Sequence, residues 1–540
     1  MVFVSAVLYN ATSVIEWVDG MFKLNGFSRA IRKSAVIFGG VLLLLSCDNP
    51  TPPPATVALE ETPMAPETTE TLPQPSVLTR GMYSDFQFNP HHLENDQQQA
   101  LLHDLFEGLV IYDSQGKLFP GVAEHWETSD NKNWVFILRE DAKWSNGEPL
   151  TAADFVRSWR ELATSQSPLK TYLAFLNLKN ANEVMAGKMP AEKLGIEALD
   201  ERILRIVLDK KTPYLPAMLT HSVLLPSHPS SEPNQIIGNG AYQFVAQQGD
   251  TAILARNPYY WGNANVYFDQ VNYRKIASDQ MENNLDLIEN VQNITPETTF
   301  LPKLCIYFYE FNFADPMLAK NEVRKALRAM LSVRNLVPQD GQRTEASVSF
   351  LPQSMQPEQE GSWEPTLVEN LLQAAGINDK SPLQLTLTFD QDSFHPQIAQ
   401  RLIQAWSQSD MIRIHANPVS WQTLLEKRAK GDFQIIRSGW CADYNDLSAF
   451  LINFYSKSPD NKSGYANSEV DQLLEKSMEK ISTQEREAIY NQIVQLLKND
   501  NVVLPIFQYR TPISANPDLL GIDSSNPTGM IYSKDLRRAN

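Results

Sequence analysis

The 540-residue sequence contains none of the short motifs that mark common nucleotide-binding, hydrolytic and metal-binding sites. It has no phosphate-binding loop, no dinucleotide-binding glycine pattern, no Gly-x-Ser-x-Gly turn and no His-Glu-x-x-His helix. Its eight histidines are scattered, and the adjacent pair His91 and His92 cannot share one helix face. We therefore predict a protein that is not an enzyme and that needs no cofactor and no metal ion.

Basic residues are also in the minority. The chain has 46 Lys and Arg against 63 Asp and Glu, which gives a net charge of −17. Such a balance argues against nucleic acid or an anionic membrane surface as the main partner, and it is compatible with cationic ligands. The length predicts two to four domains, and a hydrophobic content of 43% provides for large cores.

Long apolar runs are limited to a segment near the N-terminus. Basic residues between Lys23 and Lys33 precede an apolar run over 35–45, which is short for a membrane span and typical of an export signal. The run ends Leu-Leu-Ser-Cys47, which resembles a bacterial lipobox and implies that Cys47 is lipidated and becomes the mature N-terminus. Asp48 resembles an inner-membrane retention signal. Residues 1–47 are thus predicted to be an upstream extension and a lipoprotein signal peptide, with translation starting at Met21.

The only other cysteines are Cys305 and Cys441. An even pair in an exported protein predicts one disulfide. It would close a loop of about 135 residues and stabilise the fold by about 4–5 kcal/mol in the loop-entropy model.

Residues 48–77 are rich in Pro, Thr and Glu and contain no glycine and no basic residue. This composition cannot bury enough apolar surface to fold, and the prolines keep the chain extended. We predict a disordered tether that reaches up to about 90 Å from the membrane.

The stretch from Arg437 to Asn445 is the strongest candidate for a binding site. Apolar residues alternate over 432–436, which predicts a strand ending at Gly439, and a helix is expected just past Asn445 or Asp446. The intervening strand-to-helix turn is where ligands bind in open α/β sheets. Our hypothesis is that Asp443 holds a cation there; the alternative is a surface loop whose acid caps a helix.

Other segments predict an α/β pattern with defined helix ends. We expect a strand at 134–139, a helix ending with Gly108 as its C-cap, and three capping boxes that open helices. The expected capping boxes begin at Thr151, Ser468 and Ser482. Further predicted elements are helices at 321–330, 398–406 and 421–428 and a strand at 383–389.

Five stretches, in this order, resemble the peptide-class solute-binding proteins of ABC importers (solute-binding family 5). They are Asp104 to Trp159, Gly240-Ala241-Tyr242, Arg256 to Trp261, Cys305 to Asn312 and the Arg437 to Asn445 stretch. The likeness is strongest to the periplasmic oligopeptide-binding and murein-peptide-binding proteins. It covers most of residues 78–540.

This resemblance implies a two-lobed α/β fold of the periplasmic-binding-protein type II-like class, in its large three-domain variant. The lobes would close over a ligand by a hinge motion. The implied domains are lobe 1 domain I at 78–106, 232–304 and 511–540, lobe 1 domain II at 107–231, and lobe 2 domain III at 305–510.

The resemblance also implies roles for individual residues. Asp443 would bind the amine of a peptide, and the backbones of two segments would pair with the peptide as an added strand. The segments are Glu94, Asn95 and Asp96 on one lobe and Gly439, Trp440 and Cys441 on the other. The peptide carboxylate would meet Arg437, Arg428 or His395, and Glu310, Trp421 and Trp440 would line side-chain pockets.

Each of these roles has a structural alternative. Arg437 could form a salt bridge at a strand end, Arg428 could belong to a solvated charged face, and His395 could cap a helix. The two tryptophans could be core residues. The chain also departs from the family pattern at Leu169, at Phe308 and at the pair Asn95-Asp96.

Together these features predict the lipid-anchored, extracytoplasmic solute-binding component of an ABC importer. It would capture oligopeptides as a monomer at the periplasmic face of the inner membrane of a Gram-negative bacterium and deliver them to membrane permease subunits. Nucleic acid is not an expected partner. Alternatives are a specialised binder of haem, murein peptide or antimicrobial peptide, a non-transporting lipoprotein on the same fold, or a periplasmic peptidase or amidase.

Overall fold

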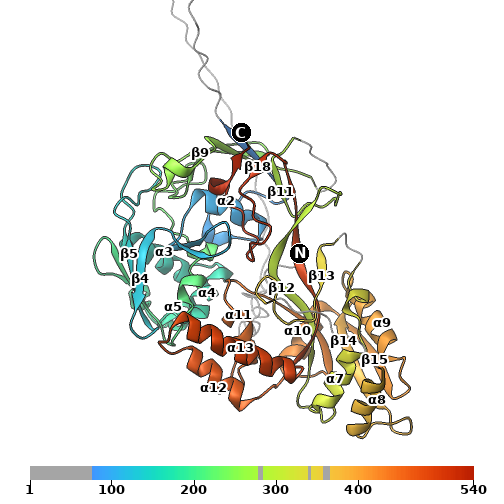
Figure 1. Ribbon diagram of the computed structural model, residues 1–540. Helices are drawn as coiled ribbons and strands as arrows, with labels where there is room; N and C mark the ends of the chain where they lie inside the picture. The colour runs from blue at the N-terminus through green and yellow to red at the C-terminus, as the bar shows by residue number, and fades with distance from the viewer. Residues whose placement is uncertain (1–75, 278–283, 339–341, 357–364, 540) are drawn as a thin grey trace, which may run out of the picture. The chain divides into compact units, whose positions relative to one another are not determined.

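The computed structural model describes residues 76–277, 284–338, 342–356 and 365–539 (Figure 1). The predicted signal peptide with Cys47, and the predicted tether up to residue 75, lie outside the described residues. The prediction that the tether extends to residue 77 is wrong at Ser76 and Val77, because the Ser76 N–H donates to Asp269 and the first strand starts at Val77. Within these ranges, no helix combines the length and apolar character needed to cross a bilayer.

The largest element is a mixed 11-stranded sheet in the order β15-β14-β16-β12-β17-β11-β1-β10-β9-β8, with β13 also paired to β17. It brings together strands from Val77–Met82 and from the region between Tyr242 and Ala515, which agrees with the predicted α/β class. Its strands are β1 (Val77–Met82), β8 (Tyr242–Gln248), β9 (Thr251–Arg256), β10 (Gln270–Lys275), β11 (Leu287–Glu289), β12 (Thr299–Phe311), β13 (Thr344–Ala346), β14 (Leu383–Asp390), β15 (Ile412–Val419), β16 (Ile435–Cys441) and β17 (Val503–Ala515).

Three smaller sheets accompany it. A four-stranded sheet has the order β4-β5-β7-β6, and the pairs β2-β3 and β18-β19 form two-stranded sheets. The predicted strand at 134–139 is confirmed as β5. The bounds are β2 (Val110–Tyr112), β3 (Leu118–Pro120), β4 (Ala123–Thr128), β5 (Asn133–Leu138), β6 (Ile196–Ala198), β7 (Ile203–Val207), β18 (Leu519–Leu520) and β19 (Arg537–Arg538).

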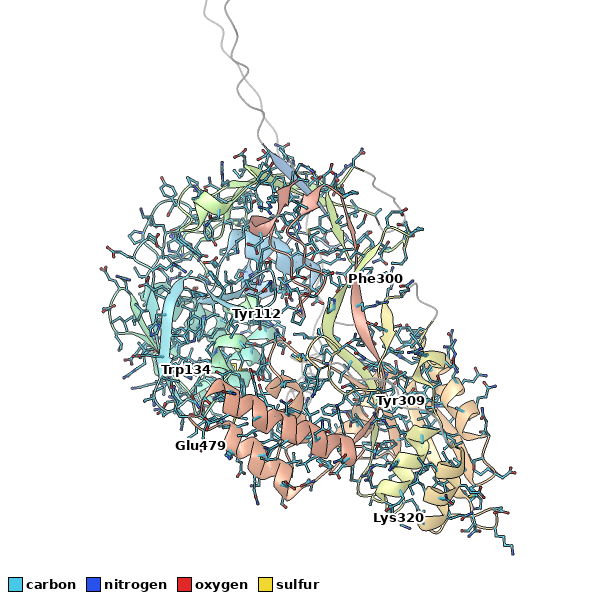
Figure 2. The ribbon with its side chains drawn as sticks, viewed as in Figure 1. Tyr112, Trp134, Phe300, Tyr309, Lys320 and Glu479 are labelled. Atoms are coloured by element: carbon cyan, nitrogen blue, oxygen red, sulfur yellow. A yellow bond between two sulfur atoms is a disulfide. The ribbon has the colours of Figure 1, made fainter. Side chains whose placement is uncertain are left out.

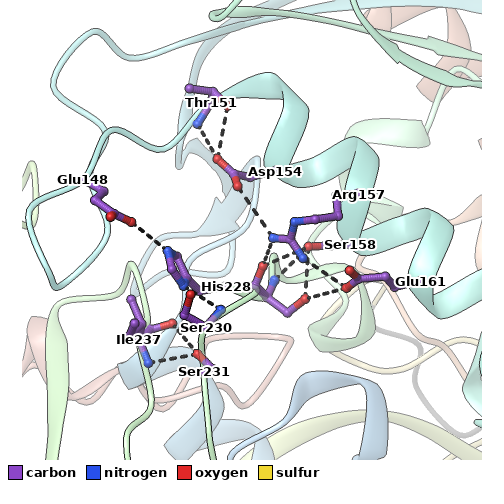
Figure 3. Close-up of polar contacts among 11 residues, drawn as sticks. Glu148, Thr151, Asp154, Arg157, Ser158, Glu161, His228, Ser230, Ser231 and Ile237 are labelled. Carbon is purple, nitrogen blue, oxygen red and sulfur yellow. Dashed lines mark hydrogen bonds and ion pairs between the residues drawn. The ribbon is translucent and has the colours of Figure 1, made fainter.

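The capping box predicted at Thr151 is confirmed at the start of α3 (Ala152–Thr164). The Thr151 N–H donates to the Asp154 carboxylate at 2.9 Å, which satisfies a backbone donor that the first helical turn leaves open (Figure 3). One turn later, Arg157 and Ser158 both donate to the backbone carbonyl of Ser227 (Figure 3). These contacts fix the start of α3 against the segment that leads into β8.

The predicted C-cap at Gly108 is wrong. The helix concerned, α2 (Gln97–Leu105), ends three residues earlier, with Phe106 in an extended conformation. The reason is tertiary: the Leu105 carbonyl accepts from the Gly240 N–H at 2.9 Å, and the Glu107 N–H donates to the Asn239 side chain at 3.1 Å. The chain therefore leaves the helix to bond with this distant loop.

The C-terminal helices follow the prediction closely, with one shift. The capping box at Ser482 and Glu485 is confirmed at the start of α13 (Thr483–Asn499). Gly431 caps the end of α10 (Trp421–Lys430), and its φ of 67° suits glycine. The expected cap at Ser468 is wrong by one residue, because the Asn467 side chain accepts from the N–H groups of Glu469 and Val470 in α12 (Ser468–Ser477). α12 and α13 pack against each other (Figure 1).

The helices between residues 321 and 499 include those expected at 321–330, 398–406 and 421–428, which are confirmed. β14 confirms the strand expected at 383–389. Their bounds are α7 (Asn321–Ala329), α8 (Pro365–Ala374), α9 (His395–Trp406), α10 (Trp421–Lys430), α11 (Ser448–Leu451), α12 (Ser468–Ser477) and α13 (Thr483–Asn499). Short helices near α3 are α4 (Tyr172–Phe175), α5 (Ala181–Met185) and α6 (Leu215–Met218).

Strands β12 and β17 connect two hydrophobic cores. Leu301 of β12 packs in the core around β1 and β10, whereas Tyr309 packs in the core around α7, α9 and β14. Figure 2 shows Phe300 and Tyr309 near the two ends of β12. The pairing of β12 with β17 shifts register between Pro302 and Ile306. The domain borders predicted at 304/305 and 510/511 fall inside these two strands.

Candidate functional site

Strand β16 is longer than predicted and forms one side of the candidate site. It does not end at Gly439 but continues to Cys441, so Trp440 and Cys441 belong to the strand and not to the turn. The extension is held by antiparallel pairing with β12, whose register places Cys305 opposite Cys441. These two cysteines form the predicted disulfide, which is confirmed.

Over much of its length, one edge of β16 is not paired with another described strand. Among the described residues, β14 pairs with it only at Ile435 and Ile436, and from Arg437 onward β16 pairs with β12 alone. Glycine is required at 439, because a Cβ there would lie 2.9 Å from the Ile306 carbonyl oxygen. An open strand edge offers backbone donors and acceptors to an extended chain.

The turn after β16 is held in place by the β2–β3 hairpin. The Asn445 N–H donates to the Tyr112 hydroxyl at 2.8 Å, and the Asn445 side chain donates to the Gly116 carbonyl at 3.0 Å. Of the two caps predicted for the following helix, Asp446 accepts from the Ser448 N–H at 2.8 Å at the start of α11. These contacts fix the backbone on the C-terminal side of Asp443.

Asp443 is a partly buried carboxylate without a counter-charge. In the described part of the chain it has no hydrogen bond and no ion pair. Burial, reinforced by the negative charge of Asp96, raises the pKa of the Asp443 carboxyl to about 7. A carboxylate in this setting is strongly stabilised by a cation that enters the site.

The predicted segment Glu94 to Asp96 lies in the loop before α2 and is not a strand. Its backbone is partly engaged, because the Glu94 N–H donates to the Gln98 side chain at 2.8 Å. The Asn95 side chain accepts from the N–H of the first residue of α2 at 3.1 Å. Asp96 accepts from the Lys303 ammonium at 2.7 Å, so the acid in which the chain departs from the family pattern forms an ion pair within the protein.

Three of the predicted residues meet around Asp390. Arg437 donates to one Asp390 oxygen at 2.8 Å through both Nε and Nη2, and its guanidinium lies 4.9 Å from the centre of the Trp421 ring. The His395 Nδ1 lies 3.2 Å from the Tyr307 hydroxyl. Burial, together with the positive charge of Arg437, lowers the pKa of His395 to about 3, so this imidazole is neutral at physiological pH.

Three others, Glu310, Arg428 and Trp440, line one pocket that is partly open to solvent. Glu310 accepts through Oε1 from Arg428 at 2.8 Å and from Ser438 at 2.7 Å, whereas its buried Oε2 has no hydrogen-bond partner in the described structure. The Trp440 indole N–H donates to the Ala449 carbonyl at 2.7 Å. The remaining wall consists of Ile306, Phe308, Phe350, Phe450, Asn453, Phe454, Asp460, Asn461, Lys462, Ser463 and Val503.

Asp390 is the residue of this region that the sequence reasoning missed. It ends β14, which is parallel to β15 and β16, and it directly precedes the loop into α9. An acid at the carboxyl end of a parallel strand was the available signal. No comparable sequence pattern indicates Lys303, the ion-pair partner of Asp96. In the described ranges, no group of three or more His, Cys, Asp or Glu side chains is placed to hold a metal ion.

Comparisons with known proteins agree with this architecture. The family model for bacterial extracellular solute-binding proteins, family 5, middle region, matches residues 117–462. A putative binding protein of Haemophilus influenzae is 46% identical over 516 residues, which is 95% of this chain and 99% of that protein. The periplasmic oligopeptide-binding protein OppA of Salmonella typhimurium is 31% identical over 506 residues, covering 86% of this chain and 93% of OppA.

A solved structure shares the arrangement over nearly its whole length. It is the unliganded open form of the periplasmic murein tripeptide binding protein MppA, with a TM-score of 0.81 and 28% identity. The match covers 86% of this chain and 98% of MppA. The resemblance read from the sequence is therefore confirmed, and the chain belongs to the family 5 extracellular solute-binding proteins of bacteria.

Proposed function

We propose that this protein captures oligopeptides outside the cytoplasm and recognises them through their free amine. The observation that carries the proposal is Asp443, a partly buried carboxylate with no partner among the described residues. A peptide ammonium is a cation of the size that such a carboxylate can bind, and the resulting charge-assisted hydrogen bond is strong. The peptide-binding functions named for OppA and MppA support this choice of ligand.

The open edge of β16 supplies the second part of the recognition. A peptide anchored at Asp443 extends along the backbone of Gly439 to Cys441 and pairs with it as an added strand. Backbone pairing gives affinity without selecting side chains. The pocket lined by Glu310, Trp440 and Phe308 faces this edge and receives a ligand side chain.

In the cell, the protein is anchored by lipid on Cys47 at the periplasmic face of the inner membrane of a Gram-negative bacterium. It acts as a monomer, its two lobes close through β12 and β17, and the closed form delivers the peptide to the permease subunits of an ABC importer. It performs no covalent chemistry on the peptide. The three-domain organisation predicted from the sequence is part of this proposal.

Native mass spectrometry of the purified protein tests the proposal. We expect a pool of intact peptides with free amino termini, released when the protein is denatured. A protein that is always empty, that carries one small organic molecule, or that yields only cleaved fragments would contradict peptide capture for transport. The Asp443→Asn variant serves as the matched control, because it changes one atom of the site and should purify with little peptide.

A further inference from the structure

We infer that the two predicted lobes stay joined at a place apart from the hinge strands β12 and β17, and that closure is a rotation about this contact. The inference rests on the proposed function, because it concerns the movement by which the lobes would enclose a peptide. The contact lies between the turn from β4 to β5, in predicted lobe 1, and the connection from α12 to α13, in predicted lobe 2. We call it the pivot contact, and its residues are Thr128, Asn131 and Lys211 on one side and Met478, Glu479 and Lys480 on the other.

Two hydrogen bonds to backbone carbonyls form the centre of the pivot contact. The Asn131 side chain donates to the Met478 carbonyl at 3.0 Å, and the Lys480 ammonium donates to the Thr128 carbonyl at 2.9 Å. These bonds join residues that are 347 and 352 positions apart in the sequence. The contact is therefore a product of the tertiary fold, and it connects two segments that the predicted domain borders place in different lobes.

The pivot contact has an exposed rim and a buried interior. The ion pair between Lys211 and Glu479 (Glu479 is labelled in Figure 2) has side chains that are 40% and 55% exposed, so water screens it and it contributes little. Asn131, by contrast, is only 2% exposed. Separation of the lobes at this place would have to open a closed interface to water, and not merely break a surface ion pair.

The β4–β5 turn is held rigidly by its own hydrogen bonds. The Asp130 carboxylate accepts from the N–H groups of Lys132 at 2.9 Å and of Asn133 at 2.7 Å. Asn131 has a left-handed backbone with a φ of 59°, and its carbonyl accepts from the Thr212 N–H at 2.8 Å. These bonds fix the direction in which the Asn131 side chain leaves the turn, so the contact with predicted lobe 2 is preorganised.

Apolar packing extends the contact towards the amine site. Tyr444, which directly follows Asp443, is 2% exposed, and its ring stacks on that of Tyr214 with 5.5 Å between the ring centres. The ring of Phe175 lies 6.4 Å away on the same predicted lobe as Tyr214. One hydrophobic core also contains buried side chains of predicted lobe 1 and of α12 and α13. Lobe separation here would expose this apolar surface to water, which opposes it.

These contacts are made in an open arrangement, because the described chain shares its arrangement with the unliganded open form of MppA. They hold the turn that carries Asp443 against predicted lobe 1 through Tyr444 and Asn445. The amine end of the site is thus assembled before a peptide arrives. Closure then brings the rest of predicted lobe 2 towards lobe 1 by rotation about the pivot contact and the hinge strands.

A cross-link across the pivot contact tests the inference. The double variant Lys211→Cys, Glu479→Cys is joined by a short bis-maleimide; Cys305 and Cys441 do not react, because they form a disulfide. The matched control is the same variant with both thiols capped by N-ethylmaleimide. Tri-, tetra- and pentapeptides of alanine serve as probes. Calorimetry measures their affinity, and small-angle X-ray scattering measures the decrease in radius of gyration on closure.

We expect the cross-linked protein to differ from the capped control by less than about threefold in affinity and to show the same decrease in radius, because the contact is kept in both forms. A larger change of affinity in either direction, or a radius that no longer responds to peptide, would overturn the inference and leave the proposed function intact. Peptide binding without any decrease in the radius of the capped control would overturn it too, because there would be no closure. Binding of none of the peptides by the wild type would overturn the proposed function as well.

Removing the two central hydrogen bonds should have the opposite effect to joining the lobes. The double variant Asn131→Gly, Lys480→Ala deletes both donors, and glycine adopts the left-handed backbone of residue 131 without strain. We expect a larger radius of gyration without ligand and an affinity at least about threefold lower, because the lobes can separate further and a smaller fraction of molecules is ready to bind.

The control for this variant is Asn177→Gly. Asn177 has the same left-handed φ of 59°, but its side chain donates to Thr212 within predicted lobe 1. This variant should keep the wild-type radius and affinity. If the Asn131→Gly, Lys480→Ala protein is folded by circular dichroism and also keeps both wild-type values, the pivot contact does not hold the lobes together and the inference is wrong.

Discussion

Arg437 and Asp390 form a buried ion pair in which two guanidinium nitrogens lie 2.8 Å from a single carboxylate oxygen. Removing one partner of such a pair leaves the other charge buried and unsatisfied, which typically costs about 3–5 kcal/mol. We therefore expect Asp390→Ala to lower the free energy of unfolding by that amount in denaturant titrations. The control is Asp410→Ala, because Asp410 pairs with Arg413 at 3.8 Å on the surface and its loss should have no measurable effect. Equal stabilities of the two variants would show that the Arg437–Asp390 pair contributes nothing.

Ligand affinity should depend on pH through Asp443. Burial and the nearby Asp96 raise the pKa of Asp443 to about 7, so this carboxyl is neutral below that pH and charged above it. The peptide amine loses its proton above a pKa of about 7.7–8.0. Affinity should therefore be greatest between about pH 7 and 8 and should fall towards tenfold per unit at lower pH.

Titration calorimetry at a series of pH values checks this profile. In the Asp443→Asn variant, the decrease on the acidic side should disappear, because no carboxyl at this position takes up a proton. A wild-type affinity that stays constant from about pH 5 to pH 7 would show that Asp443 does not titrate in the free protein.

In the ligand-free protein, ionisation of the Asp443 carboxyl should lower the free energy of unfolding, whereas it raises the affinity for a peptide amine. The folded-state pKa of Asp443 is raised above the usual value, so the folded protein binds this proton more tightly than the unfolded chain does. Its contribution to stability is fully present below the unfolded pKa of about 4 and is lost as the pH rises through 7. Thermal unfolding of ligand-free wild type and Asp443→Asn should therefore diverge as the pH increases, with the variant becoming the more stable of the two. A constant difference between the two proteins would contradict this.

The disulfide between Cys305 and Cys441 should make a large contribution to stability. It joins adjacent strands across 136 positions of sequence, so reduction releases a long loop in the unfolded chain. We expect the double variant Cys305→Ala, Cys441→Ala to lose about 2–5 kcal/mol of unfolding free energy. Adding a reductant to the wild type should reproduce this loss, and the double variant should not respond to the reductant. A variant as stable as the oxidised wild type would refute the prediction.

The parts of the fold that depend on local sequence were predictable. The capping boxes at Thr151 and Ser482 were identified because each is made by residues three positions apart. The end of α2 was not, because it is decided by bonds to Asn239 and Gly240 from a loop more than 130 residues away. The end of β16 was misplaced for a similar reason, since its pairing with β12 extends it to Cys441.

In the site too, features that depend on local sequence could be predicted, whereas contacts between distant residues could not. Asp443 could be proposed from its turn and from the family resemblance, and the structure adds that it lacks a partner in the described residues. The pairing of Arg437 with Asp390 and of Arg428 with Glu310 joins residues 47 and 118 positions apart, and no local pattern indicates it. Sequence could therefore suggest which residues surround the ligand, but not which of their charges are already balanced.

The most direct test of this account compares a free-amine peptide with its N-acetylated form on wild type and on Asp443→Asn by titration calorimetry. A hydrogen bond to a charged group contributes about 1.5–3 kcal/mol, so the wild type should prefer the free amine by about tenfold to a hundredfold. The variant should bind the two forms with equal affinity. A wild type that does not distinguish them, or a variant that keeps the wild-type preference, would contradict the assignment of Asp443 as the amine-binding residue.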